Sequence, residues 1–433
     1  MSITRTDVRD HAGLDWSQRF AGRRALGSGD LTAILSLVGS SDTITFSGGF
    51  PAAETLPADL VAPIVADLLA RDAARTLQYT PTQGLASSRE AIAKLVTATQ
   101  GARPDPAGTL VTSGGIEALS LVSRVFLEPG DSVVVEAPTY LGALMAFDGS
   151  GVELLGVPMD GEGMRVDELE RLLAARQGRP APKLCYVIPD HQNPTGLSLS
   201  LERRRALVEV CRRHGILVVE DVAYRELGFD GAPPPSLWTL GPDVVVQIGT
   251  FSKILFPGSR LGWAVGPAEV VAAMAVAKQN TDQCAGALGQ QIMTAFVEGG
   301  HFPAHLARAR ALYEARCLAM LDALARWMPV GATWTRPRGG FFVWLTAPRG
   351  ADTVRMAGAA HTENVAFVPG APFYADGSGA NQIRLAYSAV GAERIEEGVS
   401  RVARLLAAEL GGEHDETGTS EGPAHVPAGE AVR

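Results

Sequence analysis

Lysine is scarce in this sequence, so each lysine can be examined for chemistry. Of the 38 Lys and Arg residues only four are lysines. Lys94 and Lys278 lie on helical patterns that predict solvated side chains, and Lys183 begins a strand. Lys253 instead follows an apolar run and stands among hydroxyls in the segment 249–253 (GTFSK). A lysine in a desolvated site can lose its proton and act as a Schiff-base nucleophile, so Lys253 is a candidate for that role, with an ordinary loop lysine as the alternative.

An acidic pair ends a second apolar run. Residues 216–219 are apolar, and Glu220 and Asp221 follow them directly. A buried carboxylate without a partner costs several kcal/mol, so Asp221 is expected to face a polar or charged group. Tyr224 would bring a phenol to the same place. The alternative for Asp221 is a helix cap for the segment that follows.

Two further strand ends carry residues suited to ligand binding. Gly114 and Gly115 stand between an apolar run and a helical pattern, where glycine lets an anion approach the free amides of a helix N-terminus. Pro194 restricts the backbone after Asn193, so the amide of Asn193 would be held at a strand end. Both segments are also compatible with ordinary turns.

The elements that must position these residues are visible as an alternation of strands and helices. The segments that connect successive apolar runs have helical patterns, which indicates βαβ units and a mostly parallel sheet that is buried on both faces. The connection 249–260 is too short for a crossover helix, so the last strand should run antiparallel. Ligands collect at the carboxyl ends of such strands, where the candidate residues lie. Seven apolar runs have strand length: 109–112, 132–136, 152–157, 183–188, 216–220, 244–248 and 261–265.

The pattern changes after a long helical stretch at 270–327. Short strands at 334, 341–345 and 383–387 are followed by a helix at 391–410. This order predicts a second, smaller α+β lobe.

The fold class expected is therefore α/β. A large domain, residues 61–299, would hold a seven-stranded, mostly parallel sheet between layers of helices, and a smaller α+β domain would span residues 300–410. Residues 1–60 are expected to contribute to the smaller domain. The tail 411–433 is acidic and rich in Gly, Pro, Thr and Ser, so it is expected to be disordered.

Composition excludes several classes of protein. The chain has 433 residues, of which 46% are hydrophobic, enough for a large core. Its net charge of −9 argues against a nucleic-acid partner. The sequence contains no apolar run of about 20 residues, the length that a membrane-spanning helix needs. The polar N-terminal stretch 1–28 lacks the apolar core of a signal peptide. Cys185, Cys211, Cys284 and Cys317 are far apart, so neither a disulfide framework nor a metal site is expected, and the compartment is expected to be cytoplasmic.

Taken together, these residues resemble the fold-type I pyridoxal-phosphate (PLP) enzymes, specifically the class I/II aminotransferases. The resemblance covers roughly residues 20 to 410. Segments 47–51 (SGGFP) and 77–81 (LQYTP) are most similar to the subgroup that acts on 2-aminoadipate, kynurenine and aromatic or branched amino acids. The family's order of motifs is carried by 137–140 (APTY), 193–196 (NPTG), Asp221 with Tyr224, Ser252-Lys253 with Arg260, and Arg384.

The resemblance implies roles around the cofactor ring. Lys253 would bind PLP covalently and, once freed by the incoming amine, move a proton between the substrate Cα and the cofactor. Asp221 would pair with the pyridine nitrogen, and Asn193 and Tyr224 would hydrogen-bond the ring's 3-oxygen. Tyr140 would stack on the ring face.

The resemblance also implies how the phosphate and the substrate are held. The phosphate would contact the amides and side chains of five residues, namely Gly114, Gly115, Thr250, Ser252 and Arg260. Tyr79 would reach a phosphate in a neighbouring subunit, which implies a homodimer with shared active sites. Arg384 would clamp the substrate α-carboxylate, with Asn193 and Gly49 as further substrate-binding residues. The alternative for Arg384 is a strand-edge arginine that faces water.

Two segments depart from the subgroup. Gly115-Ile116 stands where the subgroup has a Ser and a Gln, so fewer side chains would hold the phosphate. Asp190-His191 stands where the subgroup more often has an uncharged and an aromatic residue, and it borders the cofactor region.

The function implied is a PLP-dependent aminotransferase that converts an α-amino acid to its 2-oxo acid, with a second 2-oxo acid as acceptor. Another PLP reaction on the same scaffold, such as that of a cyclase, oxidase or elimination enzyme, shares the same motifs and is the first alternative. A transcription regulator with an aminotransferase-like domain is the second, and it is disfavoured because the ~45 residues before Gly48 are few for a DNA-binding module and are not basic.

Overall fold

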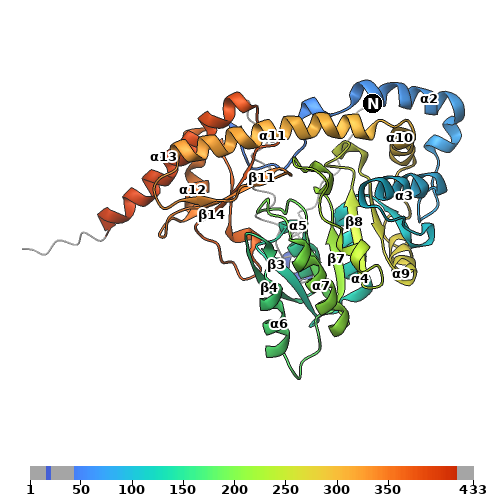
Figure 1. Ribbon diagram of the computed structural model, residues 1–433, viewed down its shortest axis with the longest axis horizontal. Coiled ribbons are helices and arrows are strands. Elements are labelled where there is room, and N and C mark those ends of the chain that lie inside the picture. Colours follow the sequence, from blue (N-terminus) through green and yellow to red (C-terminus); the bar gives the residue numbers. More distant parts are fainter. Residues whose placement is uncertain (1–15, 21–42, 417–433) are drawn as a thin grey trace, which may run out of the picture.

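The computed structural model describes residues 16–20 and 43–416, so much of the expected N-terminal segment, and residues 417–433 of the expected tail, lie outside the described residues. The described chain forms a large sheet flanked by helices and a smaller sheet beside it (Figure 1). Helix α13 (Ala392–Glu416) continues past residue 411, where the expected tail begins.

The larger sheet has eight strands in the order β2-β9-β8-β7-β6-β3-β4-β5. The neighbours from β8 to β4 pair in parallel, whereas β9 runs antiparallel to both β8 and β2, as its short connection predicted. The expectation of seven strands missed β5, which is only two residues long and pairs antiparallel with β4. The strands are β2 (Thr109–Thr112), β3 (Ser132–Ala137), β4 (Glu153–Asp160), β5 (Gly163–Met164), β6 (Leu184–Val187), β7 (Leu217–Asp221), β8 (Val245–Thr250) and β9 (Gly262–Val265).

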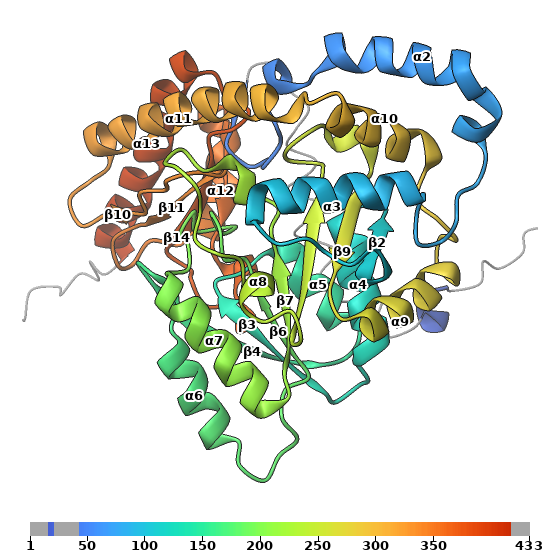
Figure 2. The same cartoon turned by 45° about the vertical axis from the view of Figure 1, so that its right-hand side comes forward.

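Helices cover both faces of this sheet (Figure 2). All residues of β2, β6, β8 and β9 are buried, which explains why these strands are apolar runs rather than alternating ones. Their Val, Ile and Thr residues also favour the extended backbone. The helices before and within this part are α2 (Ala58–Leu77), α3 (Ala86–Gln100), α4 (Gly115–Phe126), α5 (Leu141–Asp148), α6 (Val166–Ala175), α7 (Leu201–His214) and α8 (Leu237–Leu240).

The long helical stretch expected at 270–327 is three helices. These are α9 (Ala268–Gln279), α10 (Ala287–Glu298) and α11 (Phe302–Trp327). The second break contains Gly300, which has a φ of +69°, a value that glycine adopts without strain. Pro303 then occupies the first turn of α11, where its missing N–H costs no hydrogen bond.

The smaller sheet has four antiparallel strands in the order β10-β11-β14-β13. Helix α12 (Thr353–Ala359) contacts β13, and α11 and α13 pack against each other beside the sheet. The strands are β10 (Thr333–Trp334), β11 (Phe342–Thr346), β13 (Val368–Pro369) and β14 (Gln382–Ala386).

The N-terminal part of the described chain is bonded to this smaller sheet region. Strand β1 (Ile44–Thr45) pairs in parallel with β12 (Val365–Ala366). The amide of Ala386 donates to the carbonyl of Phe46 at 2.9 Å, which joins the same segment to β14. Residues 47–50 continue from there toward the larger sheet.

None of the helices in the described part of the chain is both long and apolar enough to cross a membrane.

Candidate active site

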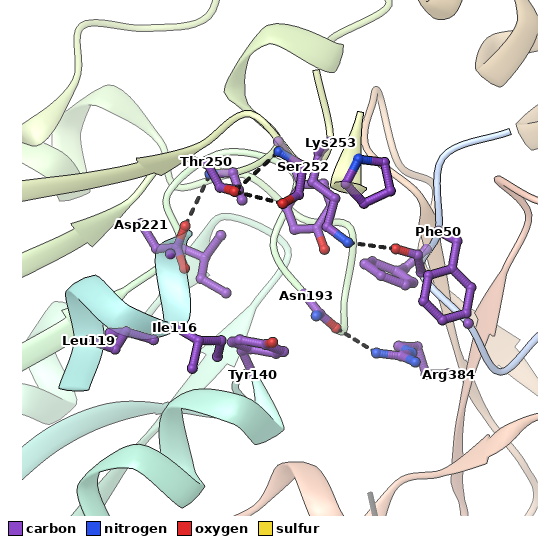
Figure 3. A pocket seen from close by; sticks show the side chains of 18 of the residues that line it. Phe50, Ile116, Leu119, Tyr140, Asn193, Asp221, Thr250, Ser252, Lys253 and Arg384 are labelled. Atoms are coloured by element: carbon purple, nitrogen blue, oxygen red, sulfur yellow. Dashed lines mark hydrogen bonds between the residues drawn. The ribbon is translucent and has the colours of Figure 1, made fainter. Parts of the chain in front are cut away.

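A pocket of about 300 Å³ lies between the carboxyl ends of the parallel strands and the smaller sheet (Figure 3). Eleven of the residues expected at the site line it: Gly49, Gly115, Tyr140, Asn193, Asp221, Tyr224, Thr250, Ser252, Lys253, Arg260 and Arg384. This is the strand edge at which α/β sheets bind ligands. The candidates from seven separate stretches of sequence therefore share one cavity.

Lys253 lies on the turn after β8 and extends into this pocket. Its Nζ donates to the carbonyl of Gly49 at 2.7 Å. Burial lowers the pKa of Lys253 to about 8, with the positive charges of Arg384 and Arg260 acting in the same direction and Asp221 against them. A substantial share of neutral, nucleophilic amine is therefore present near pH 8.

Asp221 is the last residue of β7, and its carboxylate lies at the far end of the pocket from Arg384 (Figure 3). It accepts hydrogen bonds from the Tyr186 hydroxyl at 2.9 Å and from the Ala223 amide at 3.1 Å. Burial raises the pKa of Asp221 to about 6. The short helix that follows, η5 (Arg225–Leu227), has no side-chain cap, so Asp221 is not a helix cap.

Arg384 on β14 points into the pocket rather than to water. Its Nη1 donates to Asn193 Oδ1 at 3.0 Å and its Nη2 donates to the Ser47 carbonyl. The guanidinium stacks on Phe342 and Phe373, 4.5 and 5.0 Å from the two ring centres. Its buried Nε has no partner among the described residues. A buried cation with an unused donor suits a carboxylate ligand.

Tyr224 is a further polar side chain that lines this pocket, together with Asn193. Burial raises the pKa of Tyr224 well above its usual value, so the phenol keeps its proton. Tyr140 also stays protonated, because burial raises its pKa to about 12.

A cradle for an anion lies at the start of α4. Gly114 is the N-cap residue with a φ of +111° and no capping side chain, so the first amides of α4 are free of a side-chain cap. A Cβ at Gly114 would lie 3.1 Å from Arg260 Nη2, so glycine allows this close approach. The hydroxyls of Thr250 and Ser252 are 3.0 Å apart beside it.

Two expected site residues do not line this pocket. Gly114 lies just behind Gly115, next to Arg260. Tyr79 is 77% exposed and lines a separate hollow of about 520 Å³ with Gln78, Asp282 and Cys284. Within one chain, Tyr79 is therefore not brought to the Lys253 pocket.

Sequence reasoning missed several lining residues: Ser47, Gly48, Phe50, Ile116, Leu119, Ile188, Ala223, Pro257 and Phe342. Segment 47–51 was recognised as a motif, but only Gly49 was assigned to the site. Phe342 gave no signal because it belongs to a strand whose residues are nearly all apolar.

Lys278 is also placed differently from the expectation of a solvated side chain. It is fully buried, and its Nζ lies 2.8 Å from Glu117 and 2.7 Å from Asp282. Asp282 in turn accepts from the Ser113 hydroxyl at 2.6 Å. This ion cluster is bonded to Ser113, just before α4, and to Glu117 within it, so it holds the turn at the start of α4 in place.

Comparison with known proteins identifies the chain's family. Residues 42–402 match the family model described as aminotransferase class I and II. The chain belongs to this family. It is 39% identical over 403 residues to aromatic-amino-acid aminotransferase 1 of Thermococcus litoralis, a match that covers 92% of this chain and 96% of that protein. It is also 39% identical to the 2-aminoadipate transaminase of Thermus thermophilus, with 91% and 98% covered.

Solved structures of aminotransferases have the same fold. The kynurenine aminotransferase of Pyrococcus horikoshii, solved with PMP, is 39% identical with a TM-score of 0.87, over 92% of this chain and 99% of that one. The α-aminoadipate aminotransferase of Thermus thermophilus, solved with N-(5′-phosphopyridoxyl)-L-leucine, is 38% identical with a TM-score of 0.85, over 92% and 100%. The protein is thus a PLP-dependent aminotransferase of fold type I.

The pocket of this aminotransferase fits the cofactor on its own geometry. It offers a lysine amine of lowered pKa, a buried carboxylate opposite an arginine, and a glycine turn with free helix amides. Among the described residues no group of three His, Cys, Asp or Glu side chains could hold a metal ion.

Proposed function

We propose that Lys253, Asp221 and Arg384 divide the work of transamination in this pocket. PLP, when bound, supplies an electron sink for the electrons released at the substrate Cα. Lys253 would hold the cofactor and then carry the proton at Cα, because its amine lines the pocket and burial brings its pKa to about 8. Asp221 would hold a proton on the pyridine nitrogen.

The cofactor's phosphate would be held by the α4 start and its neighbours. Gly114 and Gly115 supply backbone amides, Thr250 and Ser252 supply hydroxyls, and Arg260 supplies charge. Ile116, which follows them, adds no polar group, so Arg260 and the amides would contribute most of the binding energy. Tyr140 would lie against the ring face.

The substrate α-carboxylate would bind to Arg384. Its Nη1 donates a hydrogen bond to Asn193, and its buried Nε has no partner among the described residues, so this donor remains available for a carboxylate oxygen. Asn193 would orient this arginine and the Tyr224 hydroxyl together. The carbonyl of Gly49, which contacts Lys253 Nζ, would border the substrate at Cα.

The single observation that carries this assignment is that Lys253, Asp221 and Arg384 meet in one cavity from three distant parts of the sequence. An amino acid held by Arg384 would then have its Cα near the lysine amine. The reaction proposed is conversion of an α-amino acid to a 2-oxo acid, with a second 2-oxo acid as amino acceptor.

We further propose a homodimer with shared sites, a cytoplasmic location, a role in amino-acid biosynthesis and the division into domains stated above. The exposed Tyr79 supports the shared site, because an aromatic hydroxyl outside its own chain's pocket is free to reach another. The pairing of β1 with β12 supports assignment of the N-terminal segment to the smaller domain.

A panel of amino acids, followed by absorbance of the bound cofactor, tests the proposal. A good donor should convert the pyridoxal form to the pyridoxamine form, and a 2-oxo acid should reverse the change. If the amino acid is consumed with release of ammonia, peroxide or a cyclised product and the pyridoxamine form never accumulates, the chemistry is not transamination and the alternative PLP reactions apply.

A further inference from the structure

His191 lies two residues before Asn193, and three glycines pack closely around its side chain. Its side chain is buried, with 6% exposed, although it belongs to a loop. A Cβ added at Gly339 would lie 2.4 Å from His191 Cε1, and one added at Gly228 would lie 3.0 Å from Nε2. A Cβ at Gly340 would come within 2.8 Å of His191 Cβ. The imidazole therefore occupies space that only glycines leave open.

The three glycines belong to segments that carry pocket residues. Gly228 follows η5, which begins directly after Tyr224. Gly339 and Gly340 precede β11, whose first residue, Phe342, lines the pocket. The two segments are bonded to each other, because Gly228 and Gly339 form an isolated bridge and the amide of Gly340 donates to the Leu227 carbonyl at 3.1 Å.

Burial, helped by nearby arginines, keeps the His191 ring neutral. Burial lowers its pKa to about 4, the positive charges of Arg204, Arg225 and Arg310 act in the same direction, and Asp190 opposes them. Its Nε2 has no partner among the described residues, and its Nδ1 lies 3.5 Å from the Ser198 hydroxyl. The contribution of the ring is therefore its shape rather than its charge.

We infer that His191 is a positioning residue for the carboxylate clamp, because its ring fills the junction of three segments and fixes Asn193 against Arg384. This inference rests on the proposed role of Arg384. Asn193 accepts the 3.0 Å hydrogen bond from Arg384 Nη1, so a shift of the loop would move the guanidinium as well. Loss of the ring should weaken carboxylate binding in both ground and transition states.

Two substitutions and their combination test the fit. His191→Asn keeps a residue that tolerates its φ of +50° but removes the ring. Gly339→Ala places a methyl group in the ring's space. Each should raise KM for the amino acid about tenfold, as one weakened charged hydrogen bond would, with kcat nearly unchanged. The double variant should have a lower KM than Gly339→Ala alone, because Asn lacks the Cε1 and Nε2 atoms that would lie 2.4 and 2.6 Å from the added Cβ, and its shorter side chain can turn away from the third contact, that of Nδ1 at 2.7 Å.

KM and kcat are measured separately for each variant, together with the Kd for an unreactive carboxylate such as 3-phenylpropanoate. Gly358→Ala is the matched control, because a Cβ there meets nothing within 4 Å, and it should leave KM unchanged. Additive effects of His191→Asn and Gly339→Ala, or a loss confined to kcat, would overturn the inference. Arg384→Gln distinguishes failure of the proposed role of Arg384 from failure of the role inferred for His191. If Arg384→Gln does not raise KM, Arg384 does not bind the substrate carboxylate. If it raises KM but the effects of His191→Asn and Gly339→Ala are additive, only the positioning role of His191 is refuted.

Discussion

Lys253 shows how surroundings change the chemistry of one side chain. Its amine is enclosed with Arg384 and Arg260 nearby, and its pKa falls from the ordinary range above 10 to about 8. Below that pH the protonated amine cannot attack a carbonyl. The rate of cofactor uptake by the cofactor-free protein should therefore rise with pH up to about 8 and then level off.

Stopped-flow absorbance after mixing with PLP measures this profile. Arg384→Gln removes a positive charge and should move the midpoint to higher pH. Asp221→Asn removes a negative charge and should move it to lower pH. A profile that is flat between pH 6 and 10 would contradict the lowered pKa of Lys253.

Replacement of Lys253 by Ala should abolish covalent attachment of the cofactor and turnover, because no other lysine lines the pocket. Borohydride reduction followed by dialysis and mass measurement gives the result directly. Lys94→Ala is the control, since Lys94 is half-exposed and 3.8 Å from Glu298, far from this chemistry. A Lys253→Ala protein that retains reduced cofactor would show that another residue binds it.

Asp221→Asn should leave the cofactor bound but lower kcat about 100-fold or more, because a lost electrostatic contact of this kind is worth ~3 kcal/mol. Tyr186→Phe removes only the 2.9 Å hydrogen bond to Asp221 and should have a smaller effect. Single-turnover absorbance measures both variants. Near-normal kcat in the Asn variant would leave Asp221 a structural role only.

At the scale of elements, the strands of the larger sheet were predictable within a few residues. Their apolar runs reflect burial on both faces, and the antiparallel β9 followed from the short loop 249–260. Strand β5 was not predictable, because two residues carry no periodicity. The breaks between α9, α10 and α11 were missed although the sequence carries turn signals there, because residues 280–286 (NTDQCAG) and 299–301 (GGH) are mostly polar or glycine.

Contacts between distant elements are what the sequence concealed. Lys278 has a helical position that suggests solvent, yet its partner Glu117 comes from another helix. The site residues were found because strand ends converge by topology, while Phe342 and Ser47 come from the smaller lobe and the N-terminal segment. His191 gave only the signal that it departs from the subgroup.

The buried ion group on the loop after β6 predicts a stability effect at this scale. Asp190 lies 2.7 Å from Arg225 and also pairs with Arg204, and all three side chains are almost fully buried. Asp190→Asn would leave two buried guanidinium groups without a carboxylate and should lower the free energy of unfolding by about 3–5 kcal/mol. Asp243→Asn, which breaks the exposed pair with Arg212, is the control and should change it much less.

The pH dependence of this group has a definite sign. Burial opposes ionisation of Asp190, but the charges of Arg204 and Arg225 outweigh burial and lower its pKa below the ordinary value of 3.8. Its contribution is therefore complete above about pH 4 and is lost only as the pH falls further. Urea unfolding of the wild type and Asp190→Asn proteins at pH 5 and 7 should give the same difference.

At the scale of the whole molecule, the proposed homodimer with shared sites predicts complementation between subunits. Lys253→Ala and Tyr79→Ala homodimers should each be impaired. A mixed dimer would contain one site with both defects and one with Lys253 and a normal Tyr79 from its partner. Mixing the two variants should therefore restore up to about half the wild-type activity per mixed dimer, and light scattering should give the mass of a dimer.

Activity that does not recover on mixing, with subunit exchange verified by tagged chains, would show that Tyr79 acts within its own subunit or not at all. Tyr79→Phe is the conservative variant. It removes only the hydroxyl, so it distinguishes the contribution of the hydroxyl from that of the aromatic ring.

The segment 44–50 links the two sheets mechanically. It is hydrogen-bonded to β12 and β14, yet its Gly49 carbonyl holds the Lys253 amine and its Ser47 carbonyl holds Arg384. A rigid rotation of the smaller lobe would carry the carbonyls of Ser47 and Gly49 with it. Because Lys253 belongs to the larger sheet and Arg384 to the smaller one, such a rotation would stretch the first contact and preserve the second. The architecture thus makes the freedom of the lysine amine depend on the angle between the lobes.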